Sequence, residues 1–499
     1  MLGLRGKIVT FDPGRPVVDQ GVLYVGEDGR IGAIVAAGDD PPEPFASVEP
    51  IDTEGVLYPG LIDLHNHILY NLRSLWSPVG RTEPYTTHNQ WPGAHDYSAE
   101  ITAPARVWST SPAAKEVLAF AEAKAIVGGT TAIQGAPGTS KPYEGFLVRN
   151  VDNETFGTHK DLVSQSVLTL EEPDLQGRAE QMTKKGITFV YHLGEGTAPG
   201  LLKEFTDASH AGCLQERLVA IHGTVLDQEQ FAEWSSHAGS IVWSPFSNLW
   251  LYHDTTKVDL ARDAGIRICL GSDWAPSGSK HILGELKVAD LWNREHLDGT
   301  FSAQELCELV TANPADALHW TDQVGRLRET LFADVLVVDA DSNEDPYRNL
   351  IESTEENVRL VLIGGKAKYG RTSLMHAAGA DAAEPIHQAG RGRQISLAGG
   401  QEPMTWSHVV DSLEAVRADP QAALHHADNL RAAGEVPFEL TPDMPEPTGP
   451  LERAADMANV VIPPLDTFRH DEAFFDALER DRAPILDGLL DGLRDYYRG

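Results

Sequence analysis

Short apolar runs alternate with longer stretches of helical periodicity through the middle of this chain. The stretches at 198–208, 227–237 and 256–264 have the spacing of helices. Strands that alternate with helices form βαβ units around a parallel sheet, and eight such strands close into a (β/α)8 barrel, the TIM barrel. We therefore predict an α/β fold with a barrel whose strands lie at 61–66, 130–135, 146–150, 163–169, 187–192, 218–222, 240–244 and 266–271.

Four of these apolar runs end in residues that can bind a metal ion. His65 and His67 close the first run, and His192, His222 and Asp273 follow three later ones. Side chains two apart on a strand lie on one face about 6 to 7 Å apart, so the first two histidines can hold one ion. The carboxyl ends of barrel strands converge on one face. The pattern therefore predicts one site built from distant parts of the chain.

These segments resemble the amidohydrolase superfamily of metal-dependent barrel hydrolases, over roughly residues 1–370. Within it, the pattern His192-x-x-Glu195 resembles the mononuclear deaminase and chlorohydrolase branch, which includes cytosine deaminase-like and triazine hydrolase-like enzymes. The matching segments are Pro59 to His67, Gly128 to Thr131, His192 to Glu195, Ala220 to Gly223, Ser244 to Asn248, Leu270 to Asp273, Thr311 to Ala315 and Ala333 to Asp339.

The resemblance implies one Zn²⁺ or Fe²⁺ per chain, with four ligands. Those ligands are His65, His67, His192 and Asp273. A divalent ion in such a site lowers the pKa of a bound water to about 7 and supplies hydroxide at neutral pH.

Three side chains are candidates for the catalytic work. Asp273 can accept the proton of the water, and Glu195 can carry a proton to the leaving group. His222 can hydrogen-bond the hydroxide and steady negative charge, or become a ligand in a two-metal site. The expected reaction is hydrolysis at an sp² carbon of a heterocycle, amidine or amide, which breaks a non-peptide carbon–nitrogen bond as deaminases do.

Two alternatives remain open. The first is a binuclear cyclic amidase or imidase, which usually bridges its metals with a lysine after the fourth strand. Here 162–169 holds no lysine, Lys160 lies at the wrong end, and Glu171 and Glu172 read more simply as an acidic first helical turn. The second, more remote alternative is a non-catalytic protein that binds metal.

The long segment 68–112 follows the first strand and is expected to cover the pocket as a lid. Its aromatic side chains suit a flat ring, although they could instead only pack the lid down. Trp243 stands where many deaminases of the resembling branch carry a histidine. The residues expected to contact the substrate are Arg73, Trp76, Trp243, Asn248 and Trp274.

The rest of the chain divides around the barrel. Residues 1–58 and 326–370 contain short strands that are expected to pair into one small β-sandwich from both ends of the core, with the barrel at 59–325 between them. Residues 371–499 lie outside the resemblance and predict a mostly helical extension, with helical segments at 406–433 and 471–497 and a Pro/Glu linker at 437–450.

Charge and cysteine content narrow the partners. With 74 Asp and Glu against 40 Lys and Arg, the formal net charge of −34 argues against binding to nucleic acid or anionic membranes. The partner that the resemblance implies is a small-molecule substrate. The same excess suggests salt adaptation as a hypothesis. Three scattered cysteines, no signal-peptide core and no long apolar run predict a cytoplasmic protein. A homo-oligomer is left open.

Overall fold

The computed structural model describes residues 1–139, 143, 145–340, 345–387, 392–400, 402–441, 459–465, 471–485 and 492–498, with backbone only at 139, 481–485 and 498. Most of the expected linker at 437–450 lies outside these residues. Among the described helices, none is long and apolar enough to cross a membrane.

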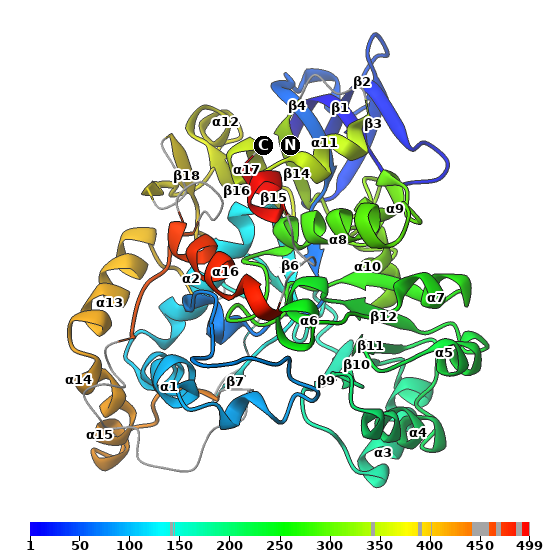
Figure 1. Cartoon of the computed structure of the whole chain (residues 1–499). Coiled ribbons are helices and arrows are strands. Elements are labelled where there is room, and N and C mark those ends of the chain that lie inside the picture. The colour runs from blue at the N-terminus through cyan, green and yellow to red at the C-terminus, as the bar shows by residue number, and fades with distance from the viewer. Residues whose placement is uncertain are drawn as a thin grey trace.

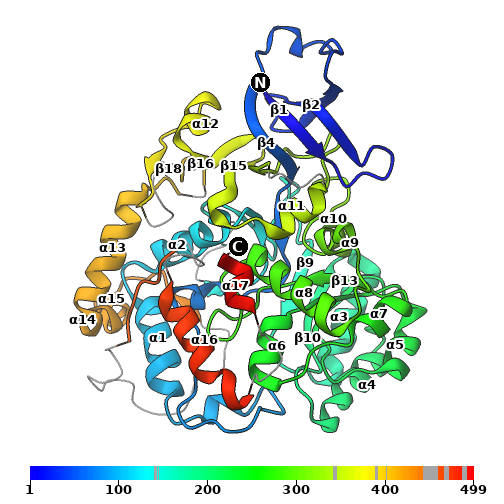
Figure 2. The same cartoon turned by 45° about the horizontal axis from the view of Figure 1, so that its top comes forward.

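One nine-stranded sheet joins the two ends of the core (Figures 1 and 2). The joint is the antiparallel pair β4 and β14, in which Leu57 lies opposite Val337. One buried cluster takes Leu23 from the first part and Leu360 from the second. The strands, in sheet order, are β17 (Glu384–Pro385), β18 (Arg393–Ile395), β16 (Lys366–Arg371), β15 (Val358–Ile363), β14 (Val335–Asp339), β4 (Ile51–Pro59), β1 (Leu2–Val9), β2 (Val17–Val25) and β3 (Ile31–Ala36).

All eight expected barrel strands are present, but they form two parallel sheets. The strands are β5 (Leu61–Asp63), β6 (Thr130–Ile133) and β8 (Arg149–Asn150) in one sheet, and β13 (Arg267–Leu270), β12 (Ser240–Trp243), β11 (Leu218–His222), β10 (Thr188–Leu193) and β9 (Val163–Ser166) in the other. The sheets meet where Leu64 N donates to Leu270 O at 3.3 Å and Asp273 N donates to His65 O at 2.9 Å.

The prediction of a closed barrel is wrong at one seam. Among the described strands, β8 and β9 do not pair. The reason is local, because β8 has two residues and the sequence of β9 is Val-Ser-Gln-Ser, of which only Val163 is buried. So short and polar a pair offers little apolar surface to bury. The fold is therefore a barrel-like α/β domain beside a sheet domain, and the domain boundaries stay predictions.

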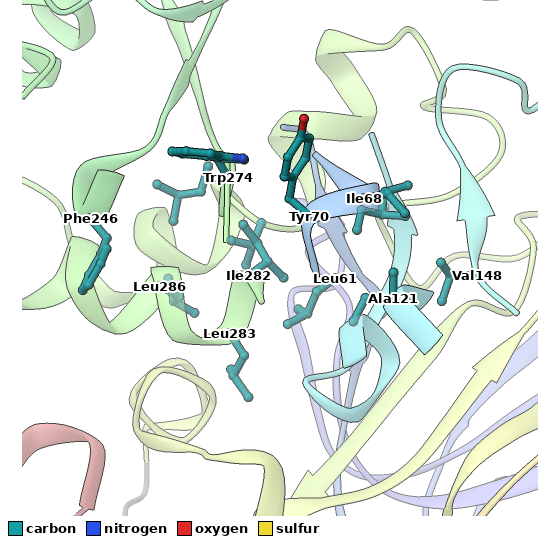
Figure 3. Close-up of a cluster of buried hydrophobic side chains, with 14 of the residues drawn as sticks. Leu61, Ile68, Tyr70, Ala121, Val148, Phe246, Trp274, Ile282, Leu283 and Leu286 are labelled. Atoms are coloured by element: carbon teal, nitrogen blue, oxygen red, sulfur yellow. The ribbon is translucent and has the colours of Figure 1, made fainter. Parts of the chain in front are cut away.

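Helices cover the outside of the strands and the ligand-bearing end. Figure 3 shows side chains of α8, among them Ile282 and Leu286, in one buried cluster with Leu61 of β5. The helices of this part are η2 (Ile68–Leu72), η3 (Trp91–Gly93), η4 (Ser98–Thr102), α1 (Ala103–Thr110), α2 (Ala114–Val127), α3 (Glu172–Lys185), η5 (Pro199–Leu201), α4 (Leu202–His210), α5 (Gln228–Ser235), α6 (Pro245–Tyr252), α7 (Val258–Asp263), α8 (Ile282–His296), α9 (Ala303–Glu308) and α10 (Ala312–Ala317).

The remaining elements lie in the sheet domain and the extension. They are η1 (Phe45–Ser47), β7 (Gly138–Thr139), α11 (Pro346–Glu352), η6 (Glu355–Asn357), α12 (Thr372–Ala377), α13 (Trp406–Ala418), α14 (Pro420–Leu424), α15 (His426–Ala432), β19 (Leu440–Thr441), α16 (Glu472–Ile485) and α17 (Leu493–Arg498). Trp406 stacks on Phe120 of α2, and Phe474 of α16 stacks on Phe246 of α6. The described helices of the C-terminal extension thus pack on the barrel domain (Figure 2), and a mostly helical extension over 371–499 stays a prediction.

A buried ion pair ties this extension to the barrel. Lys280, just before α8, forms an ion pair with Asp471, and both side chains are about 3 % exposed or less. Lys280 Nζ also donates to Pro464 O at 3.2 Å. Asp471 additionally accepts from Phe474 N at 3.1 Å at the start of α16. The extension therefore supplies the partners of a buried cation of the barrel.

Replacing Asp471 by Asn should lower the free energy of unfolding by about 3 to 5 kcal/mol, because Lys280 would stay buried without its counter-charge. Asn still caps helices well, so loss of the cap is not the cause. Urea denaturation measures the change. Glu414→Gln, which breaks the exposed pair with Arg417 on α13, is the control and should change stability little. Equal stability of both variants would contradict the anchoring role.

Candidate active site

Five polar side chains from the ends of four strands meet at one place. His65 and His67 follow β5, His192 lies on β10, His222 ends β11 and Asp273 follows β13. Asp273 Oδ1 lies 2.9 Å from His65 Nε2 and 3.5 Å from His67 Nε2. The ring centroids of His65 and His192 are 4.6 Å apart, and those of His192 and His222 are 5.3 Å apart.

The donor atoms of these side chains fit a divalent cation. Atoms of His65, His192 and His222, and likewise of His65, His67 and Asp273, lie within 4.8 Å of one another. Burial, with the neighbouring imidazoles, holds the pKa of His192 well below its usual value and lowers that of His222 to about 3. A lowered pKa favours the neutral imidazole, which is the form that binds metals. His192 Nδ1 is buried and has no hydrogen-bond partner.

The hydrogen bonds around His65 also indicate a cation site. Gln134 Nε2 donates to Asp152 Oδ1 at 3.2 Å, which turns Gln134 Oε1 toward His65 Nδ1, 3.2 Å away. An amide oxygen can only accept, so Nδ1 carries the proton and Nε2 presents a lone pair. That lone pair faces a carboxylate oxygen of Asp273 at 2.9 Å. Two such electron-rich atoms need a proton or a shared cation between them.

The backbone bends sharply at two of these residues. His222 has a φ of 67° and Asp273 a φ of 62°, in the left-handed region that residues with a side chain seldom adopt. Such strain is held in place by surrounding contacts and gathers at functional sites. Here the backbone bends at the end of β11 and just after β13, so the side chains of His222 and Asp273 both turn toward the other histidines of the site.

A buried carboxylate locks the ends of β5 and β13 together. Asp63 accepts from Ser272 N at 3.0 Å and from the Ser272 hydroxyl. Asn66 Nδ2 donates to Ser272 Oγ at 2.9 Å. Burial raises the pKa of Asp63 to about 6, and the hydrogen bonds from Ser272 oppose that rise. This clamp holds the segment of His65 and His67 against the segment of Asp273.

The two carboxyls inside the site have opposite environments. Burial, followed by the charge of Asp273, raises the pKa of Glu195 to about 8, and Tyr252 OH donates to Glu195 Oε1 at 2.7 Å. Burial alone would also raise the pKa of Asp273, but the imidazoles of His65 and His222 hold it well below its usual value. Near pH 7 this favours a protonated Glu195 and an ionised Asp273, a division that suits an acid and a base.

A cavity of about 440 Å³ opens in front of these side chains. Its aromatic walls are Trp91 and Trp274, whose rings are inclined by 26° with centroids 6.4 Å apart. Among the described lining residues none is Lys or Arg. The lining consists of His67, His88, Asn89, Trp91, Val167, Leu168, Thr169, His192, Glu195, His222, Leu251, Asp273, Trp274 and Ser277. His88, Asn89 and Trp91 come from segment 68–112, which therefore covers the pocket.

Of the five residues expected to contact the substrate, Trp274 alone is in this lining. Arg73 is buried, donates to Asn459 O and lies 3.6 Å from Glu100. Trp76 packs against Tyr97 with ring centroids 5.5 Å apart and donates Nε1 to Asp96 at 3.3 Å. Both lie outside the cavity lining, where these contacts pack segment 68–112 against its neighbours.

Trp243 and Asn248 also lie outside the cavity lining. Trp243 Nε1 donates to Thr255 Oγ1 at 2.7 Å, and Asn248 Nδ2 donates to His222 Nδ1 at 3.1 Å. Any effect of these two residues on the site therefore passes through His222. The sequence pattern did not indicate Tyr252, His88 or Gln134, because their positions depend on how the segments fold back on one another.

Glu171 and Glu172, the candidates to bridge a second metal ion, do not belong to this group of side chains. Glu171 is exposed and stands at the N-cap of α3, and Glu172 is the first residue of that helix. Neither is in the metal-competent groups found among the described residues.

Comparison with known proteins places the fold and the site in context. The amidohydrolase family model matches residues 178–368. A 5-methylthioadenosine/S-adenosylhomocysteine deaminase of Symbiobacterium thermophilum is 25 % identical over 415 residues, 73 % of this chain and 92 % of that protein. The protein of the same name from Pyrococcus furiosus is 32 % identical over 130 residues, 26 % of this chain and only 30 % of its own length.

A solved structure has a similar fold. Atrazine chlorohydrolase from Arthrobacter aurescens TC1, complexed with zinc, superposes with a TM-score of 0.59 at 19 % identity, covering 74 % of this chain and 95 % of that one. At this identity the similarity concerns the fold alone.

At Gly271 the two clamped segments pack closely together. A Cβ added there would lie 2.5 Å from His65 Cβ and 2.9 Å from His65 N. Gly271→Ala should therefore push the metal-binding residues apart and weaken zinc affinity about 10-fold or more, measured by competition with a chelating dye.

The matched control is Gly177→Ala on the exposed face of α3. A Cβ there meets nothing within 4 Å, and alanine is the better helix former. We expect this variant to bind zinc as the parent does. Equal affinity of both variants would mean that the approach of β5 and β13 does not shape the site.

Proposed function

We propose that this chain, whose residues 178–368 match the amidohydrolase family model, is a metal-dependent hydrolase that breaks a non-peptide carbon–nitrogen bond as deaminases do. The observation that carries the proposal is the convergence of His65, His67, His192 and Asp273, the last three of which line one cavity together with Glu195. We propose that these first four side chains hold a single Zn²⁺ or Fe²⁺. When bound, the ion lowers the pKa of a water to near 7 and polarises the bond under attack.

Two carboxyl groups of the site then carry out the two proton transfers of the reaction. Asp273, ionised and beside two of the histidines, takes the proton of the attacking water. Glu195, with its raised pKa, gives a proton to the departing nitrogen. Tyr252 holds Glu195 by the hydrogen bond to Oε1, which keeps the proton-bearing group aimed at the cavity. His222, with Nε2 3.7 Å from Glu195 Oε2, faces the oxygen on which negative charge develops.

The walls of the cavity favour a flat, uncharged small molecule. Trp91 and Trp274 offer ring faces, and Leu168 and Leu251 add apolar surface. Without Lys or Arg in the described lining, an anionic group on the substrate would find no counter-charge. Deaminases of heterocycles are among the relatives of this chain, and we propose an amino-substituted nitrogen heterocycle as its substrate. A two-metal amidase is disfavoured by the exposed Glu171. A cytoplasmic location and a homo-oligomer stay predictions.

Metal content tests the cofactor directly. Elemental mass spectrometry of protein purified without added metal or chelator should find one zinc or iron per chain. His192→Asn should lose most of that metal, because a ligand is gone. His237→Asn, at an exposed position of the turn after α5, should keep it. Two ions per chain would reject the single-metal site.

Glu195→Gln tests the proton shuttle. The variant should keep its metal and release ammonia from aminopyrimidines, aminopurines or aminotriazines about 100-fold or more slowly, because the amide cannot deliver the proton. Glu229→Gln, on the exposed side of α5, is the control and should match the parent. Turnover by Glu195→Gln at the parent rate would remove Glu195 from the mechanism. No ammonia from any heterocycle with the metal in place would overturn the deaminase proposal.

A further inference from the structure

We infer that Trp243, Thr255 and Asn248 form a hydrogen-bond relay that sets which ring nitrogen of His222 carries its proton. The relay makes His222 a hydrogen-bond donor to the reacting centre and withholds it from the metal. The inference deepens the proposed function and rests on it for the role of His222, while the position of the proton can be measured without any turnover.

The relay begins at a group that can act in one way only. The indole N–H of Trp243 donates and never accepts, and it reaches Thr255 Oγ1 at 2.7 Å. Thr255 therefore accepts from the tryptophan, and its own hydroxyl hydrogen is available for Asn248 Oδ1, 3.4 Å away. Trp243, Thr255 and Asn248 are all at most 3 % exposed, so bulk water does not compete for these groups.

The orientation of the Asn248 amide follows from this start. Asn248 Oδ1 faces the hydroxyl of Thr255, and Nδ2 faces His222 Nδ1 at 3.1 Å. In the reverse orientation an amide N–H would point at Thr255 Oγ1, and the buried hydroxyl hydrogen of Thr255 would lose Asn248 Oδ1, the acceptor that the described residues offer it. Thr256 fixes the backbone alongside, since its hydroxyl donates to His222 O at 2.6 Å. The whole group is tied to the strand end that carries His222.

The proton of His222 then has one place left. Nδ1 accepts from Asn248, so in the neutral ring the hydrogen sits on Nε2. Nε2 is the atom that faces the cavity side of the site, 3.7 Å from Glu195 Oε2 and 4.0 Å from Asp273 Oδ2. A nitrogen that bears a hydrogen has no lone pair for a metal. His222 is thereby a donor of a hydrogen bond and not a ligand.

His65 shows the opposite arrangement in the same site. Its Nδ1 meets the amide oxygen of Gln134, which leaves the lone pair on Nε2 free for a cation. The nitrogen of one amide thus faces His222, and the oxygen of another faces His65. Trp243, Thr255 and Asn248 are positioning residues, because none of them lines the cavity.

Asn248→Asp is the sharpest test, because a carboxylate accepts and would draw the proton of His222 onto Nδ1. Protein labelled with ¹⁵N-histidine, metal-free and zinc-loaded, is compared by NMR, and the His222 signals are identified by their loss in His222→Gln. In the parent we expect the hydrogen on Nε2. In Asn248→Asp we expect it on Nδ1, with kcat lowered about 100-fold as one hydrogen-bond donor is lost.

Thr255→Val removes the hydroxyl without changing the size of the side chain. It should leave a mixture of the two ring forms and lower kcat about 10-fold with little change in KM, since the substrate still meets the same walls. Thr255→Ser keeps the hydroxyl and should restore the parent pattern of ring protons.

A hydrogen on Nδ1 in the parent, or ring protons that do not respond to Asn248→Asp, would overturn the relay. If the parent carries the hydrogen on Nε2 and no heterocycle releases ammonia, the relay stands and the proposed function fails. The two conclusions can therefore be rejected separately.

Discussion

The approach of β5 to β13 is the constraint on which the site depends. Three metal-competent side chains, His65, His67 and Asp273, lie on the two segments that follow these strands. Asp273 lies 2.9 Å from His65 and 3.5 Å from His67, and the contact of Asp63 with Ser272 clamps the two segments together. Gly271 permits the approach, because any side chain there would meet His65. A buried carboxylate held by a backbone N–H and a hydroxyl is costly to disturb, so this junction resists relaxation.

From this junction the electrostatics of the site follow. The clamp brings Asp273 against two imidazoles, and their proximity overrides the burial that would otherwise keep its carboxyl protonated. Glu195 lies 3.7 Å from His222 through Oε2 and accepts from Tyr252 through Oε1, but burial has the largest effect on its pKa. Two carboxyls of similar intrinsic acidity are thus separated by position alone. A cation held by the histidines would favour the charged form of both, and most strongly that of Asp273.

The sequence predicts the strand ends well and their surroundings poorly. His65, His192 and Asp273 could be brought together because each follows an apolar run and parallel strands end on one face. The strand spans were recovered for the same reason, apart from closure between β8 and β9, where the runs are too short and polar to pair. Arg73 and Trp76 were misplaced because aromatic and cationic residues in a long loop suit a pocket and its outer packing equally well. Their partners, Asn459 and Asp96, could be known only from the folded chain.

Trp243 shows why the remaining part of the site lies beyond sequence patterns. Its position at the end of β12, where deaminases of the resembling branch often carry a histidine, indicates a place at the site but not a direction. In the structure the ring is buried outside the cavity lining, the indole N–H donates to Thr255, and the effect on the site passes through Asn248. Whether an amide presents its oxygen or its nitrogen to a histidine is decided by the next hydrogen bond along, and that partner comes from another segment. The side-chain amides of Gln134 and Asn248 therefore give two histidines opposite roles. His65 can bind a cation, and His222 can donate a hydrogen bond.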